Sequence, residues 1–117
     1  MKKIEAIIRK SRFEDVKQAL MDADIDWFSY WDITGLGKST EEQVVRGQVF
    51  KSGYIQRRMI SIVVRDINLD KTVKAIISSA QTGELGDGKV FVYDISETYR
   101  IRNGESGPEA LYNAESK

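Results

Sequence analysis

The N-terminal part of the chain alternates apolar and polar residues and then changes to a helical period. The alternation predicts a strand over Lys2–Lys10. Ser11 and Glu14 have the spacing of a capping box, which predicts that a helix begins there and continues to about Asp24. Its expected buried face consists of Phe13, Val16, Leu20 and Ala23.

The same order of patterns continues along the chain. A second strand is expected over Trp27–Leu36, ending at Gly35 and Gly37. Its aromatic cluster, Trp27, Phe28, Tyr30 and Trp31, is expected in the core or in a subunit interface, and stacking on a nucleobase is the less favoured alternative. Asn68 is expected to cap a second helix. The apolar face of that helix should consist of Leu69, Val73, Ile76, Ile77 and Ala80. Further strands are predicted over Arg57–Val64 and Val90–Tyr99.

The two halves resemble each other when Ile4 is laid onto Ile60, an offset of 56 residues that also pairs Phe13 with Leu69. Two such halves predict an α+β ferredoxin-like βαββαβ sandwich, formed by residues 1–117 as a single domain. Met59, Ser61 and Val63 alternate with more apolar positions, so the open sheet face should contact another subunit. We therefore expect a homo-oligomer.

Two segments depart from regular patterns. Residues 37–55 are charged and polar without a clear period, and a loop of this length in a small domain is usually functional or disordered. We interpret it as functional. The tail, about residues 103–117, contains the only proline of the chain and is expected to be partly mobile.

Composition excludes several kinds of chemistry. The chain of 117 residues has no cysteine and no histidine, which excludes disulfides, thiolate or histidine metal sites and histidine-based triads. Eighteen basic and eighteen acidic residues balance, so no overall charge attracts nucleic acid. The N-terminal apolar run is too short for a signal peptide or a membrane span, and we expect a cytoplasmic protein without membrane insertion.

The sequence TGELGDGK, residues 82–89, has the glycines needed for a backbone nest that binds an anion, with Lys89 adding positive charge. Asp87 is expected to shape the turn. Arg100 and Arg102 lie two residues apart in a segment predicted to be extended, where both side chains would face one way. Separately these are an ordinary turn and a solvated strand end, but together they favour a polyphosphate site.

A rival interpretation is that Phe91 and Tyr93 stack on RNA bases. That signature belongs on the third strand of its fold, whereas residues 88–95 form the fourth, so we expect no nucleic-acid partner.

With the duplicated pattern, the long segment and AQTGELGDGKVFVYD followed by RIRNGE, the chain resembles the PII nitrogen-regulatory signal-transduction proteins over nearly its whole length. The resemblance implies a homotrimer with ATP or ADP in clefts between neighbouring subunits. It also implies that residues 37–55 are the T-loop, which would bind an ammonium transporter or a nitrogen-metabolism enzyme.

The resemblance assigns roles to single residues. For nucleotide binding it implies Ile7, Ser29, Gly35, Gly37, Lys38, Ser61, Val63, Gly86, Asp87, Gly88, Lys89, Arg100 and Arg102. For a carboxylate effector such as 2-oxoglutarate it implies Ser39 and Arg57. For the protein partner it implies Arg46, Gly47 and Phe50.

Three of these residues depart from the family's pattern. Phe50 occupies the region of the modifiable tyrosine and has no hydroxyl to accept a nucleotidyl group. Ser39 replaces a glutamine that contacts metal and 2-oxoglutarate in the family, and its side chain is too short to offer the same amide carbonyl. Binding of Mg²⁺ and 2-oxoglutarate is therefore left undecided by the sequence. Ser61 replaces an acidic residue near the adenine.

The leading hypothesis is therefore a non-enzymatic, adenine-nucleotide-responsive regulator of nitrogen metabolism. One alternative is a PII-like regulator with a changed ligand. The other is a slow nucleotide hydrolase that uses Asp87 or Glu84 as its base.

Overall fold

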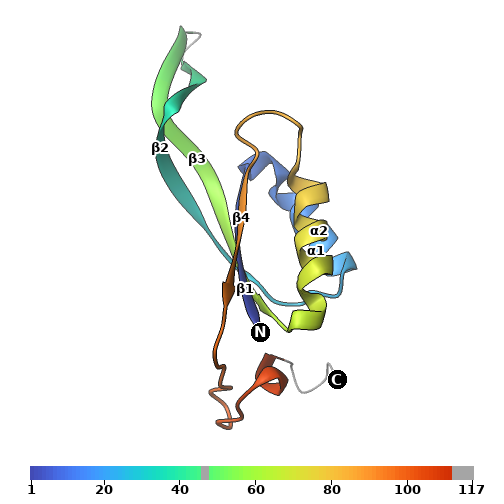
Figure 1. Cartoon of the computed structure of the whole chain (residues 1–117). Coiled ribbons are helices and arrows are strands. Elements are labelled where there is room, and N and C mark those ends of the chain that lie inside the picture. The colour runs from blue at the N-terminus through green and yellow to red at the C-terminus, as the bar shows by residue number, and fades with distance from the viewer. Residues whose placement is uncertain (46–47, 112–117) are drawn as a thin grey trace.

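The structure is a computed structural model that describes residues 1–45 and 48–111, with residues 38–45 and 48–52 described through their backbone only. Its regular elements, shown in Figure 1, are β1 (Lys2–Ile8), α1 (Phe13–Asp22), β2 (Ser29–Val45), β3 (Gln48–Val64), α2 (Leu69–Ala80) and β4 (Gly88–Asp94). Short 3-10 turns span Lys10–Arg12, Asp66–Asn68 and Pro108–Leu111.

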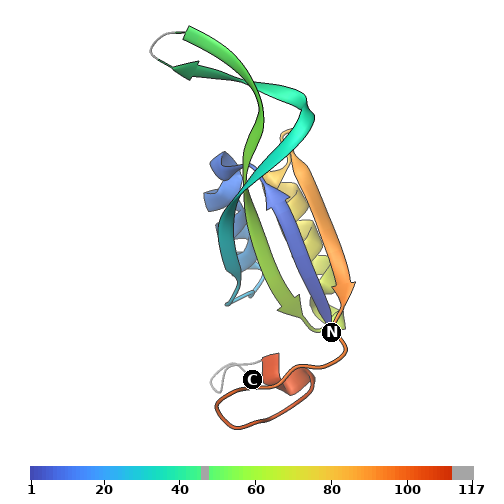
Figure 2. The same ribbon diagram turned by 90° about the vertical axis from the view of Figure 1, so that its left-hand side faces the viewer.

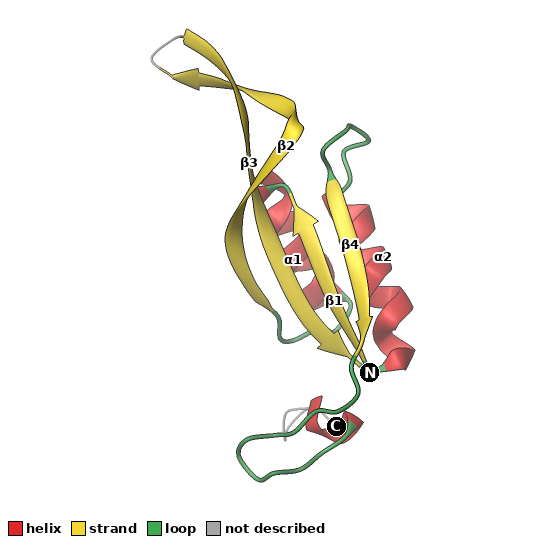
Figure 3. Ribbon diagram, turned by 60° about the vertical axis from the view of Figure 1, so that its left-hand side comes forward, coloured by secondary structure: helices red, strands yellow, loops and turns green. Residues whose placement is uncertain are grey.

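The four strands form one sheet in the order β2-β3-β1-β4, and every neighbouring pair is antiparallel. Both helices pack on the same face of this sheet, as Figures 2 and 3 show, and the opposite face has no layer from the described part of the chain. This arrangement confirms the predicted ferredoxin-like α+β fold. The segment with Phe91 and Tyr93 is the edge strand β4, not the central strand that an RNA-binding signature of this type requires.

The core lies between the sheet and the helices. Ile4, Ala6 and Ile8 point toward the helices from β1, since successive side chains of a strand alternate between faces. Ile60 and Ile62 do the same from β3, where they pair with Ala6 and Ile4. The predicted helical residues Phe13, Val16 and Leu20 complete the core from α1.

The internal duplication is visible in the structure at the predicted offset of 56 residues. The 3-10 turn Lys10–Arg12 corresponds to Asp66–Asn68, and the helices that follow begin at Phe13 and Leu69. Arg9 and Arg65, which precede these turns, have similar extended backbone conformations. Each half therefore enters its helix in the same way.

The second strand does not end at its glycines, contrary to the prediction. β2 continues to Val45 and β3 begins at Gln48, so the described backbone of the segment expected to be a loop forms a long hairpin that projects beyond the sheet (Figure 1). The pairing is interrupted between Leu36 and Glu41, where the register shifts. No strand was predicted here because residues 37–55 are charged and polar without a clear alternation.

Other local predictions were also wrong. Ser11 does not cap α1, because it lies inside a 3-10 turn and Arg12 occupies the N-cap position without a side-chain bond. Asn68 does stand at the N-cap of α2 but caps through no side-chain bond. The buried line of that helix is Thr72, Ile76 and Ala80, which leaves Ile77 47% exposed.

The last strand is shorter than predicted, because it ends at Asp94 and not at Tyr99. Beyond it, Tyr99 forms an isolated antiparallel bridge with Ser106 around a turn. The aromatic residues at the start of β2 are not core residues of the single chain either. Trp27, Tyr30 and Trp31 are between 45% and 77% exposed, so the core placement is wrong for these three in the single chain, whereas Phe28 packs against the core.

Candidate functional site

The glycine-rich segment forms a compact loop, residues 81–87, between α2 and β4. Gly83, Gly86 and Gly88 all have positive φ, between 89° and 109°, as the anion-nest interpretation requires. Gly88 is also packed against β1, where a Cβ atom would lie 1.7 Å from the carbonyl oxygen of Ile7. Only glycine fits at this position.

Asp87 holds the loop in shape, as the sequence predicts. Its carboxylate accepts hydrogen bonds from the backbone N–H of Thr82 at 2.7 Å and of Gly83 at 2.9 Å, and from the Thr82 hydroxyl. The Thr82 hydroxyl is the largest of the causes that lower the pKa of Asp87 far below its usual range. The loop's own carboxylate therefore occupies two N–H groups that an external anion would otherwise approach.

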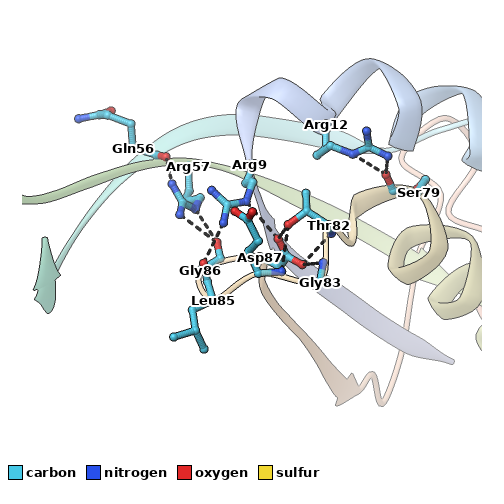
Figure 4. A network of polar contacts seen from close by, with 11 residues as sticks. Arg9, Arg12, Gln56, Arg57, Ser79, Thr82, Gly83, Leu85, Gly86 and Asp87 are labelled. Carbon is cyan, nitrogen blue, oxygen red and sulfur yellow. Dashed lines mark hydrogen bonds and ion pairs between the residues drawn. The ribbon is translucent and has the colours of Figure 1, made fainter. Parts of the chain in front are cut away.

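Two arginines clamp the loop from neighbouring strands (Figure 4). Arg9, just after β1, donates through Nε to Asp87 at 3.1 Å and through Nη2 to the Leu85 carbonyl at 2.9 Å. Arg57 on β3 donates through Nε and Nη2 to the Gly86 carbonyl at 3.2 and 2.9 Å. The loop is thus bound to the root of the long hairpin.

Arg9 was missed by sequence reasoning. Its contacts span 76 and 78 residues, so no local pattern indicates them. The one available signal is its equivalence to Arg65 in the duplication, which marks both as residues at the end of a strand. Arg57, predicted as an effector ligand, is buried, and its Nη1 donates to the Gln56 carbonyl at 2.8 Å.

Several predicted nucleotide-binding residues lie at this end of the sheet, which we call the glycine-loop end. Lys89 pairs with Ile7, and Gly35 pairs with Ile55, close to the Arg57 position on β3. The predicted residues gathered here are Ile7, Gly35, Gly37, Gly86, Asp87, Gly88 and Lys89.

The other predicted residues line a cleft at the opposite end of the sheet, beside the C-terminal segment. We call it the basic cleft because its five cationic lining residues, Lys17, Arg65, Lys71, Arg100 and Arg102, outnumber its two acidic ones, Asp24 and Asp26. Between them lie three predicted adenine contacts, which are Ser29, Ser61 and Val63. Ser29 and Ser61 are directly paired across β2 and β3, so both hydroxyl side chains are on the open face of the sheet.

Arg100 and Arg102 do not lie in an extended strand, which corrects the prediction. Residues 101–103 form a turn, in which Gly104 has positive φ and its N–H donates to the Arg100 carbonyl at 2.8 Å. The Arg100 guanidinium forms an ion pair with Glu105 and donates to the Glu109 carbonyl at 2.9 Å. Both arginines therefore line the cleft from a turn, and not from the extended segment that was predicted.

The glycine loop and the two arginines are therefore far apart in one chain. The whole of β4 separates them, and its seven residues span roughly 20 Å at the usual rise of a strand. A single phosphate chain cannot touch both within one chain. The interpretation of these residues as one site requires the glycine-loop end of one chain to meet the basic cleft of another.

The remaining predicted residues cannot be placed. Arg46 and Gly47 lie outside the described residues, as do the side chains of Lys38, Ser39 and Phe50. Within residues 1–45 and 48–111, no group of three or more acidic side chains is arranged to hold a metal ion. None of the helices in the described part of the chain is long and apolar enough to cross a membrane.

The fold defines this chain as a ferredoxin-like α+β protein with a long hairpin and a glycine loop at one end of its sheet. Comparison with known proteins makes the class more specific. The profile of the family described as "Nitrogen regulatory protein P-II" matches residues 1–105, and the chain belongs to this family of nitrogen-regulatory signalling proteins.

Individual relatives agree with this result. The chain is 38% identical over 112 residues to "Nitrogen regulatory protein P-II" of Pasteurella multocida, covering 95% of this chain and 100% of that protein. It is equally similar to "Nitrogen regulatory protein P-II 1" of Escherichia coli K12, at 38% over the same length. Among solved structures, "Structure of B. subtilis GlnK" has a TM-score of 0.78 at 34% identity and covers 94% of this chain and 97% of that one.

Proposed function

We propose that the protein is a cytoplasmic, non-enzymatic sensor that binds ATP or ADP in clefts between the subunits of a homotrimer. The observation that supports this is the division of the predicted ligand residues between the two ends of the sheet. Each chain has a preformed loop at one end and a basic cleft at the other, and a cyclic assembly brings one against the other. The open sheet face, with Trp31 and Phe91 more than 40% exposed, is the surface available for such contacts.

The output of the sensor is the long hairpin, residues 37–55. Arg57 lies at its root and binds the Gly86 carbonyl, so a ligand that shifts the glycine loop would change the free energy of the hairpin's conformations. The target that it binds is an ammonium transporter, as the family resemblance suggests, or a nitrogen-metabolism enzyme. Arg46, Gly47 and Phe50 are the proposed contact residues.

Adenine nucleotide is the proposed ligand, with its phosphates between the glycine loop and the two arginines. Lys89, Arg100 and Arg102 supply charge for the phosphates, while Ser29 and Ser61 provide hydroxyls beside the base. We expect the protein to bind 2-oxoglutarate weakly, and likewise the Mg²⁺ that accompanies it in the family. The guanidinium of Arg57 already donates to two backbone carbonyls, and Ser39 is shorter than the family's glutamine.

Hydrolysis is a less suitable function for the loop. A general base works best with a pKa near the working pH, whereas the pKa of Asp87 is lowered and its carboxylate accepts four hydrogen bonds from Thr82, Gly83 and Arg9. Glu84 is the other candidate base for hydrolysis. Measurement of phosphate release from ATP over hours would decide between the sensor and a hydrolase, since repeated turnovers would contradict the sensor function.

Calorimetry with ATP and ADP tests the proposal, together with sedimentation analysis of the assembly. We expect a trimer that binds up to three nucleotides. Lys89→Ala and Arg102→Ala should each weaken ATP binding by about 10- to 100-fold while leaving the trimer intact. If the protein binds neither nucleotide, or if both variants bind ATP with the wild-type affinity, the assigned site is wrong. Competition by GTP and other nucleotides identifies a changed ligand.

A further inference from the structure

Trp27 is a large apolar side chain that does not pack in the core of the described chain. It is 77% exposed, although an indole buries more apolar surface than any other side chain when it has a partner. The neighbouring aromatic residues do form a cluster, in which the Phe13 ring lies 4.6 Å from Tyr30 and 6.4 Å from Phe28. Trp27 instead lines the basic cleft.

The backbone holds Trp27 in place from both sides. At the end of α1, Asp24 adopts positive φ, and the N–H of Ile25 donates to the Leu20 carbonyl at 2.9 Å. The Ile25 side chain is buried in the core, and Ser29 begins β2 two residues after Trp27. The indole therefore projects from a short backbone connection that is restrained at both ends, so little backbone entropy is lost when it binds a ligand.

The surroundings of Trp27 are those of a nucleotide and not of a simple anion. Arg100 and Arg102 line the cleft and suit phosphate, whereas Val63 with Ser29 and Ser61 offers an apolar surface and hydroxyls. An exposed indole beside both is a stacking platform, because every nucleobase presents a π-face to an aromatic ring. Purines have the larger face.

We propose that Trp27 is a specificity-determining residue that stacks on the purine base of the bound nucleotide. This inference rests on the proposed function, since it requires a nucleotide in the basic cleft. It extends that function by giving the base its own contact, so that affinity depends on the nucleobase as well as on the phosphates.

The test compares ATP with inorganic tripolyphosphate, which has the phosphates but no base. Trp27→Ala should weaken ATP binding by about 5- to 100-fold and change tripolyphosphate binding by less than about twofold. Ile67→Ala is the matched control, because Ile67 is a similarly exposed apolar side chain, at 76% against 77% for Trp27, but does not line the basic cleft, and it should keep the wild-type affinity for both.

Fluorescence gives a second measurement on folded protein with one indole. In Trp31→Phe, ATP should quench the emission of the remaining Trp27, and tripolyphosphate should not; in Trp27→Phe the ATP response should be largely lost. Unchanged ATP affinity in Trp27→Ala, or equal losses for ATP and tripolyphosphate, would overturn the stacking role alone. Failure of the wild type to bind ATP would overturn both this role and the proposed function.

Discussion

The two ends of the sheet differ in how far each is complete within one chain. At the glycine-loop end, Asp87, Arg9 and Arg57 hold the loop through hydrogen bonds from three parts of the sequence. At the basic cleft, five cationic residues line an open surface beside Trp27 and a turn. The first end is a closed loop whose polar groups are bound within the chain, and the second is an open surface on which cationic side chains outnumber the carboxylates of Asp24 and Asp26. The glycine-loop end has the shaped backbone but not the arginines, and the basic cleft has the arginines but not the loop.

The sequence reveals the first end better than the second. The positive φ of the glycines and the turn-shaping role of Asp87 follow from short-range chemistry, which a local sequence pattern contains. The strand pattern and the duplication likewise predicted the sheet. Arg9 was missed because its partners are distant in sequence.

The second end depends on contacts that no local pattern contains. Arg100 and Arg102 were identified as a pair, but their turn depends on the Tyr99–Ser106 bridge and on the ion pair of Arg100 with Glu105. The hairpin was missed for a related reason, since its strands pair with each other and not with the core. Trp27 was expected in the core or an interface, with nucleobase stacking as the less favoured alternative, and its place on the cleft depends on segments far apart in the sequence.

The largest effect on stability is expected from Gly88→Ala, a substitution at the glycine-loop end. The new Cβ would overlap the Ile7 carbonyl at a backbone φ of 109°, which should cost on the order of 3 kcal/mol or more of unfolding free energy. Gly83→Ala is the control, since it has a similar φ but open space, and should cost about 1 kcal/mol. Urea unfolding measures both. Equal losses would mean that the loop is not packed as described.

Arg9→Met tests whether the clamp organises the loop. Loss of its bonds to Asp87 and Leu85 should weaken ATP binding about tenfold. Arg12→Met is the matched control, because Arg12 donates to the Ser79 carbonyl between the helices and should alter stability but not affinity. Calorimetry and thermal unfolding of both variants separate the two effects. A similar loss of affinity in the control would refute a specific role for Arg9.

The pH dependence of Asp87 should be smaller. Because its folded pKa is lowered, its contribution to stability is fully present above about pH 5, begins to be lost as the pH falls below the ordinary aspartate pKa, and is lost completely only as the pH falls through the lower folded pKa. Between pH 5 and pH 3, the melting temperature of the wild type should therefore fall a few degrees more than that of Asp87→Asn. Parallel melting curves would show that the carboxylate does not stabilise the loop.

Glu105→Gln should have the smallest effect, at the basic cleft. Removal of the carboxylate paired with Arg100 leaves more of its charge for phosphate, so the affinity for ATP should rise about two- to threefold. Weaker binding would indicate that the ion pair holds Arg100 in its binding position.

The most direct test of the central claim is subunit complementation between Lys89→Ala and Arg102→Ala chains, unfolded together and reassembled as mixed trimers. If each site combines the loop of one chain with the arginines of the next, about a quarter of the sites in a 1:1 random mixture have both groups intact, and that fraction should bind ATP with wild-type affinity. If both groups act within one chain, every site has one defect and no wild-type site appears, which would contradict the account.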